Sequence, residues 1–130
     1  NRDLLLTRDH ALMLGGLAVN AAALVNGRSI LREPKEALPE TITYWHIETA
    51  QHDVVLAEGA PAETFVDNVT RQSFDNYADY EARFGPERRH IEQDPAPRVG
   101  SRRQLPEALR ARLAARADEL ELEQGESVAA

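Results

Sequence analysis

The sequence predicts a mainly β domain that is followed by a covering helix, a linker and a C-terminal helix. Three observations predict this order. Short β-prone runs bounded by turn residues fill the chain before residue 60, helical spacing first appears after residue 70, and prolines, glycines and charges gather between residues 86 and 103. We therefore expect a β domain over residues 1–84, a disordered linker over 85–103, and an amphipathic helix over 104–124 with a tail to residue 130.

The first β segment is expected to bend sharply at a Thr-x-x-His motif. Residues 4–6 are three leucines, Thr7 and His10 follow, and residues 11–14 are again apolar before the turn at Gly15 and Gly16. Side chains three apart on a straight strand point to opposite faces, so Thr7 and His10 can serve one site only if the chain curls between them. Residues 17–25 are rich in alanine and allow a short helix.

Two further hairpins are predicted before residue 60. Asn26 and Gly27 tolerate the positive φ of a tight hairpin turn, and their neighbours in residues 24–31 are apolar. Residues 41–48 alternate β-branched and aromatic side chains as a strand does, and residues 53–57 return as a second strand after a turn. This last hairpin carries His46 and His52.

Two helices are expected in the second half of the chain. Residues 71–84 place aromatic side chains at helical spacing, which suits a helix that covers one end of the sheet. Near the C-terminus, Pro106 suits a first helical turn. Arginines precede acids along this helix, which opposes the helix dipole, so we expect fraying towards Gly125. Its apolar stripe consists of Leu105, Leu109, Leu113, Ala117 and Leu120.

Composition excludes several classes of partner and site. The net charge of -7 argues against nucleic-acid binding, which depends on clustered basic residues. The apolar runs fall short of the roughly 20 residues that span a bilayer, so we expect no membrane partner. The chain contains no cysteine, which excludes a thiol nucleophile within it. It begins without Met, and we expect it to be a piece of a longer protein.

The histidines suggest acyl-transfer chemistry on a peptide bond. Such a reaction needs a nucleophile, a proton donor for the departing nitrogen, and groups that stabilise the oxyanion. With an ordinary pKa of about 6.5, a histidine can both take and give a proton near neutrality. His10 is the candidate donor, and the Thr7 hydroxyl is the candidate group that holds the amide.

Three short sequence motifs carry a family resemblance. They are DHAL at residues 9–12, LVNGRSI at 24–30 and HDVVLAEG at 52–59, and the segment YWHIE at 44–48 precedes the last of them. Together they resemble the later portion of a Hint domain, the autoprocessing module of Hedgehog proteins and inteins, in its bacterial branch. The resemblance covers the chain from residue 3 to about residue 76.

This resemblance implies a partial Hint horseshoe of hairpins and an autocatalytic role for its parent protein. Cleavage in cis would proceed by an acyl shift onto an upstream Cys or Ser, with no cofactor and no metal. The partner would be the upstream segment of the same protein, and the location a bacterial surface or the extracellular space. Asp67-Asn68-Val69 lacks a following nucleophile, which favours cleavage over splicing. The piece alone is expected to be inactive. The implied catalytic residues are Thr7, His10, His46 and His52.

Other interpretations of the same residues stay open at this point. His46 is equally interpretable as a half-buried strand residue, and His52 as a turn cap. The histidines with Asp9 or Asp53 suit a zinc site by ligand type, although their spacing is not that of paired ligands. The chain as a whole could be a non-catalytic β module that binds a protein partner through its C-terminal helix. Exposed strand edges would favour self-association.

Overall fold

The structure, a computed structural model, describes residues 2–67, 70–85 and 90–129, with the side chains of the last helix described to residue 125. Within these residues, five strands form one mixed sheet in the order β3-β4-β1-β2-β5. The pairs β1·β2, β1·β4 and β3·β4 are antiparallel, and β2·β5 is parallel. The strands are β1 (Ala11–Leu14), β2 (Leu17–Asn20), β3 (Val54–Ala57), β4 (Ala60–Glu63) and β5 (Arg98–Val99).

Two tight turns set the registers of the sheet. Gly15 and Gly16 join β1 to β2 with φ values of 58° and 77°, so Leu14 pairs with Leu17. Glu58 and Gly59 join β3 to β4, again with positive φ at both positions. Two central residues with positive φ match the right-handed twist of paired strands. The predicted turn at Gly15 and Gly16 is confirmed, whereas at Glu58 and Gly59 the sequence predicted only the end of a strand.

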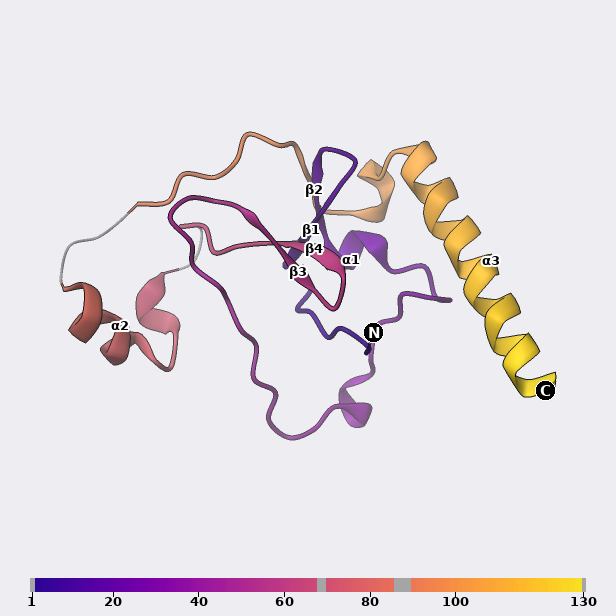
Figure 1. Ribbon diagram of the computed structural model, residues 1–130, viewed down its shortest axis with the longest axis horizontal. Coiled ribbons are helices and arrows are strands. Elements are labelled where there is room, and N and C mark those ends of the chain that lie inside the picture. The colour runs from indigo at the N-terminus through magenta and orange to yellow at the C-terminus, as the bar shows by residue number, and fades with distance from the viewer. Residues whose placement is uncertain (1, 68–69, 86–89, 130) are drawn as a thin grey trace.

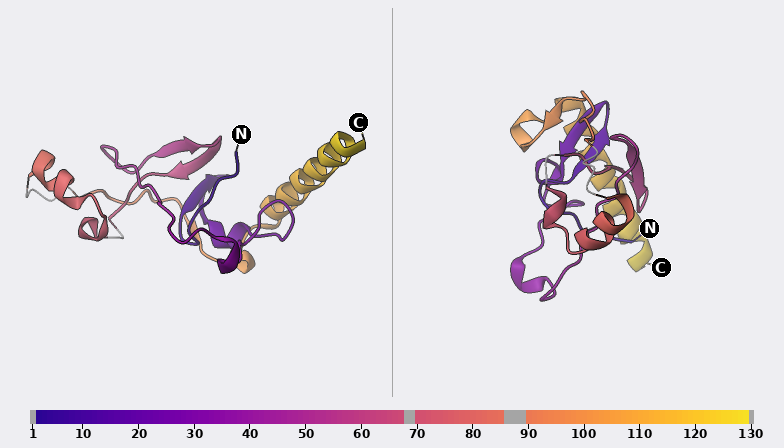
Figure 2. Two further views of the ribbon diagram at one scale, coloured as in Figure 1. Left: turned by 90° about the horizontal axis from the view of Figure 1, so that it is seen from below. Right: turned by 90° about the vertical axis from the view of Figure 1, so that its left-hand side faces the viewer.

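Three α-helices are described, and they lie outside the sheet. They are α1 (Ala21–Leu24), α2 (Tyr77–Phe84) and α3 (Glu107–Ala129), with 3₁₀ turns at Lys35–Ala37, Arg71–Ser73 and Arg102–Gln104. Figures 1 and 2 show an elongated molecule in which α2 and α3 stand at opposite ends and the sheet lies between them. Helix α2 therefore does not cover the end of the sheet as predicted. Its first turn follows Asn76 and packs with the preceding 3₁₀ turn instead.

The apolar core joins the sheet to the base of α3. Its members are buried side chains of β2, α1, β5 and the start of the C-terminal helix, namely Val19, Ala23, Leu24, Val99, Leu105 and Leu109. Leu12, Leu17 and Ile30 pack against them. Beyond its first turns α3 extends away from the sheet (Figure 1). Arg28 in a loop still reaches it through ion pairs with Asp118 and Glu121.

Three predicted β segments are not strands. Residues 4–6 and 41–48 belong to no strand, and of residues 24–31 the first ends α1 while the rest form a loop. Gly27 has the predicted positive φ of 75°, but the Asn26 side chain accepts hydrogen bonds from the backbone of Arg28 and Ile30 and so closes a loop. A β-prone run becomes a strand only where a neighbouring strand can accept its hydrogen bonds. Helical residues consequently outnumber strand residues, and the fold is a small β-sheet with helices.

The predicted linker contains ordered structure. Its residues 86–89 lie outside the described part of the chain, but Arg98 and Val99 add strand β5 to the sheet. Ile91, just before it, is almost fully buried. These two apolar side chains have places in the core, so this part of the expected linker carries ordered structure. Helix α3 covers most of the expected C-terminal helix and continues to Ala129, and the division of the chain into β domain, linker and helix stays a prediction.

Strand β3 forms one edge of the sheet. It exposes Val54 and Leu56, and Trp45 is 80% exposed on the segment that precedes it. An edge of this kind offers unpaired backbone groups to another chain. The expected self-association through strand edges stays a prediction. In the described part of the chain, no helix has the length and apolar character to cross a membrane.

Candidate functional site

The Thr7–His10 bend forms as predicted and joins its two side chains. The His10 amide donates to the Thr7 carbonyl at 3.2 Å, which closes the turn. The Thr7 hydroxyl lies 2.5 Å from His10 Nδ1. Behind the bend, the first amides of α1 anchor the backbone, since Ala21 donates to the His10 carbonyl. The hydroxyl thereby fixes the orientation of the imidazole and leaves Nε2 as the nitrogen that can serve a substrate.

His46 lies next to His10 although it is 36 positions away in the sequence. The centroids of these two rings are 4.6 Å apart, and the Phe74 ring packs against His46 in a T-shaped arrangement with a centroid distance of 5.0 Å. The His46 segment is tied down by a backbone bond from Phe65 to the Ile47 carbonyl. Arg71 also holds it, because its guanidinium pairs with Glu48 at 2.9 Å and with Asp67 at 2.8 Å. These contacts position the second histidine without a strand.

A cavity of about 320 Å³ opens between these segments. It is large enough to admit a short piece of polypeptide. We call it the histidine cavity. It is lined by Thr7, Asp9, His10, His46, Glu63, Thr64, Val66, Ser73 and Phe74.

The histidine cavity lies mainly within the residues that match a known protein family. Residues 1–69 match the family described as Hint domain. The chain belongs to the Hint domain family. No curated protein and no solved structure matches it. Since Hint domains are autoprocessing modules, the family assigns this chain a role related to protein autoprocessing at that general level.

The environment of the cavity in this Hint domain keeps its histidines neutral. Burial lowers the pKa of His10 below its ordinary value, and the neighbouring His46 lowers it further. Burial lowers the pKa of His46 as well, while the negative charge of Glu63 acts in the opposite direction on both rings. A neutral imidazole can accept a proton from a nucleophile and then pass it on.

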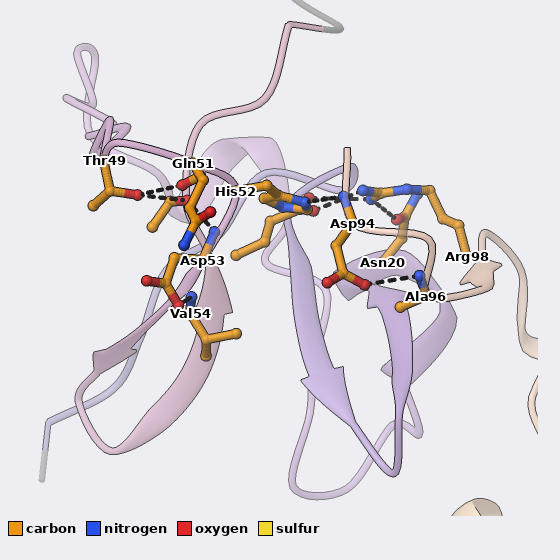
Figure 3. A network of polar contacts seen from close by, with 11 residues as sticks. Asn20, Thr49, Gln51, His52, Asp53, Val54, Asp94, Ala96 and Arg98 are labelled. Atoms are coloured by element: carbon orange, nitrogen blue, oxygen red, sulfur yellow. Dashed lines mark hydrogen bonds and ion pairs between the residues drawn. The ribbon is translucent and has the colours of Figure 1, made fainter. Parts of the chain in front are cut away.

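Of the four residues that the sequence suggested, three meet in the histidine cavity. Thr7, His10 and His46 line it, whereas His52 is not among its lining residues. The His52 side chain is 4% exposed and contacts Glu63 through Nε2 at 3.2 Å. Its Nδ1 accepts a hydrogen bond from the Asp94 amide at 2.8 Å (Figure 3). His52 therefore lies behind the cavity.

Glu63 is the residue that sequence reasoning missed. It ends β4, its side chain is 10% exposed, and its carboxylate receives the guanidinium of Arg98. Charged residues are uncommon within strands, so a glutamate among small residues at 60–63 was the available signal. Its partner stands 35 positions later, in the stretch predicted as a linker, and a local pattern does not link the two.

Neither a metal nor a nucleophile is evident in the described part of the site. No group of three or more His, Cys, Asp or Glu side chains there is arranged to hold a metal ion. Ser73 lines the histidine cavity, but its hydroxyl donates to the Thr70 carbonyl at 2.5 Å within a short turn. Asn68 and Val69, which bear on splicing, lie outside the described residues.

Proposed function

We propose that this Hint domain assists cleavage of a peptide bond in its own precursor, with Thr7, His10 and His46 as the assisting residues. The nucleophile is a Cys or Ser that precedes these residues in the precursor. The observation that carries the proposal is the hydrogen bond between the Thr7 hydroxyl and His10 Nδ1 inside a cavity that also contains His46. Placing two reactive groups on one turn converts proton transfer into an intramolecular step.

The reaction is an acyl shift followed by hydrolysis. Neutral His10, whose Nδ1 carries the ring proton and donates to the Thr7 hydroxyl, takes the proton of the thiol or hydroxyl on Nε2, and the sulfur or oxygen attacks the carbonyl of the preceding peptide bond. As the carbon–nitrogen bond breaks, His10 returns that proton to the departing nitrogen, which becomes an amine. The shift is thus an isomerisation with no net loss of a proton. Water then cleaves the thioester or ester, giving a carboxylic acid and restoring the nucleophile.

His46 supports this sequence through its charge state. If it were protonated 4.6 Å from His10, the positive charge would make His10 harder to protonate during the reaction. Kept neutral, it is available to hydrogen-bond the oxyanion of the tetrahedral intermediate. We also propose that the complete domain forms the horseshoe of hairpins characteristic of the family, in a secreted or surface-attached bacterial protein.

The test is cleavage of the precursor that contains the residues upstream of this chain. Unchanged protein and His10→Ala are expressed side by side, and intact mass is followed with time at pH 7.5. We expect two fragments from the unchanged protein and a rate about 10²–10⁴-fold lower in the variant, the usual contribution of a general acid–base. His90→Ala is the matched control, because His90 is 72% exposed and is not among the cavity's lining residues. Equal rates in all three proteins would remove His10 from the chemistry.

A second candidate function is a non-catalytic module that binds a protein partner through α3. The observation in its favour is that α3 extends away from the sheet and exposes Leu122 at 68% (Figure 2). A binding module should tolerate His10→Ala and should lose its partner when the exposed face of α3 is changed. The experiment above therefore separates the two functions.

A further inference from the structure

A buried carboxylate faces the histidine cavity and needs a compensating charge. Glu63 lines the cavity from the end of β4 with a side chain that is only 10% exposed. A carboxylate removed from water either becomes protonated or is paired with a cation and hydrogen-bond donors. The partners of Glu63 therefore decide how much negative charge His10 and His46 experience.

Arg98 of strand β5 is the principal partner. Its guanidinium donates two hydrogen bonds to the carboxylate, at 2.6 Å and 3.1 Å. It also donates to the side chain of Asn20 at 3.0 Å, so β2 and β5 together fix its position (Figure 3). A two-bond contact of this kind constrains the rotation of a carboxylate as well as its charge. Arg98 lies outside the region that matches the family.

His52 holds the carboxylate from a second direction. Its Nδ1 accepts a hydrogen bond from the Asp94 backbone and so carries no proton. The proton is then on Nε2, which donates to Glu63 at 3.2 Å. Both ring nitrogens are engaged in this way. Asp94 precedes β5 and Arg98 lies within it. This segment therefore holds Glu63 directly through Arg98 and indirectly through the contact of Asp94 with His52.

We propose that Glu63 is a positioning residue that sets the charge of the histidine cavity, and that Arg98 clamps it so that its carboxylate does not bind either cavity histidine directly. The proposal rests on the proposed autoprocessing function. Clamped, Glu63 is partly neutralised and His10 stays free to accept the nucleophile's proton. Released, the carboxylate could pair with an imidazolium and hold it protonated. The segment that carries Arg98 is then part of the site.

In the described part of the chain, charged and titratable groups face the two histidines from several segments. Asp9 comes from the bend, the Tyr44 ring centroid lies 6.3 Å from that of His10, His10 and His46 face each other, and Glu63 comes from β4. Glu48, two positions after His46 in the chain, is paired with Arg71. Arg98 and His52 act on this set through Glu63. Changes at Glu63 and at Arg98 should therefore shift the pKa values of both histidines, each in a predictable direction.

The test is a titration of His10 and His46 by NMR in the chain itself, which does not depend on cleavage. Glu63→Gln keeps the shape and removes the charge, so both pKa values should move down. Arg98→Met removes the clamp and leaves the carboxylate, so they should move up. Arg98→Lys restores a cation without the two-bond contact and should fall between the unchanged chain and Arg98→Met. Arg102→Met is the matched control, because the Arg102 side chain donates to the Val25 carbonyl and is not among the residues that line the histidine cavity, so it should move neither pKa.

Opposite shifts at Glu63 and Arg98 are the result that a merely structural role does not give. Shifts of one sign in both variants, or none, would overturn the proposal. If Arg98→Met does not fold, Glu63→Gln and Arg98→Lys still decide it. The same variants in the precursor should move the acidic limb of the cleavage rate in the same directions. If the pKa values of His10 and His46 shift as expected but no precursor is cleaved, the proposed function is rejected. The control of these pKa values by Glu63 and Arg98 would still stand.

Discussion

The apolar core and the histidine cavity are built by different kinds of contact. The apolar core joins residues of β2, α1, β5 and the base of α3 by burial of aliphatic side chains. The histidine cavity is held by polar contacts between distant segments, among them Arg71 with Glu48 and Arg98 with Glu63. Its histidines lie on a turn and on an extended segment, not on strands.

The apolar core therefore supplies most of the stability of the fold, whereas the polar contacts determine the arrangement of side chains around the histidine cavity. Apolar burial is favourable without regard to direction and accounts for most of the folding free energy. Buried ion pairs return little net stability, because desolvation offsets their attraction, but they require a definite orientation. Truncation in the apolar core should therefore act through stability, whereas removal of the Thr7 hydroxyl at the histidine cavity should alter chemistry with little change in stability near neutral pH.

The largest expected effect is on the apolar core. Leu105→Ala removes a side chain that is almost fully buried, and such truncations cost about 2–5 kcal/mol through lost burial and the cavity left behind. Leu122→Ala is the matched control on the same C-terminal region, where the side chain is exposed, and should stay within about 0.5 kcal/mol. Chemical denaturation measures both. A loss of unfolding free energy at Leu105 as small as the loss at Leu122 would mean that Leu105 is not part of the core.

A smaller effect is expected at the bend, and on chemistry alone. Thr7→Val keeps the size of the side chain and removes the hydroxyl that holds His10 Nδ1. A hydrogen bond is worth about 0.5–1.5 kcal/mol, so the cleavage rate should fall up to about tenfold while the free energy of unfolding changes little. Thr7→Ser restores the hydroxyl and should recover most of the rate. Cleavage of the precursor and denaturation of the chain give the two readouts.

The pH dependence of stability should come partly from the histidine cavity. The pKa values of His10 and His46 are lowered in the folded protein. Below about pH 6.5 these two histidines therefore bind protons more readily in the unfolded chain than in the folded chain. Stability is therefore full above that pH and is lost as the pH falls towards the lowered folded values. A double variant, His10→Asn with His46→Asn, should lose less between pH 7 and pH 5. At pH 8 the two proteins should show the same slope, and a difference there would contradict this cause.

The smallest expected effect is at the far part of α3. Arg28 pairs with Asp118 at 2.6 Å and with Glu121 at 2.8 Å, and all three side chains are solvent-exposed. Ion pairs in water contribute little to global stability and are screened by salt. Arg28→Ala should leave the unfolding midpoint nearly unchanged and should speed amide hydrogen exchange in α3 around these acids. High salt should reproduce this in the unchanged chain, and a large loss of global stability would show that the pairs are not merely local.

The sequence predicted the parts of the site that local chemistry determines. The Thr7–His10 bend and the turn at Gly15 and Gly16 depend on residues a few positions apart, and these predictions are confirmed. Where partners are distant, prediction failed. Residues 41–48 have strand propensity but no regular ladder partner, and the pairing of Glu63 with Arg98 spans 35 positions. Disorder was predicted from prolines and charges, although Ile91 and Val99 find places in the core.

Because Arg98 comes late in the sequence, its contact with Glu63 can form only late in the synthesis of the chain. A ribosome adds about 5–20 residues per second, so the 35 positions between Glu63 and Arg98 correspond to a delay of about 2–7 s after the carboxylate is made. Throughout that interval the nascent chain carries the Thr7, His10 and His46 side chains without the arginine that restrains their acidic neighbour. If the clamp is needed for reactivity, a nascent precursor is protected from cutting itself until its sheet is complete.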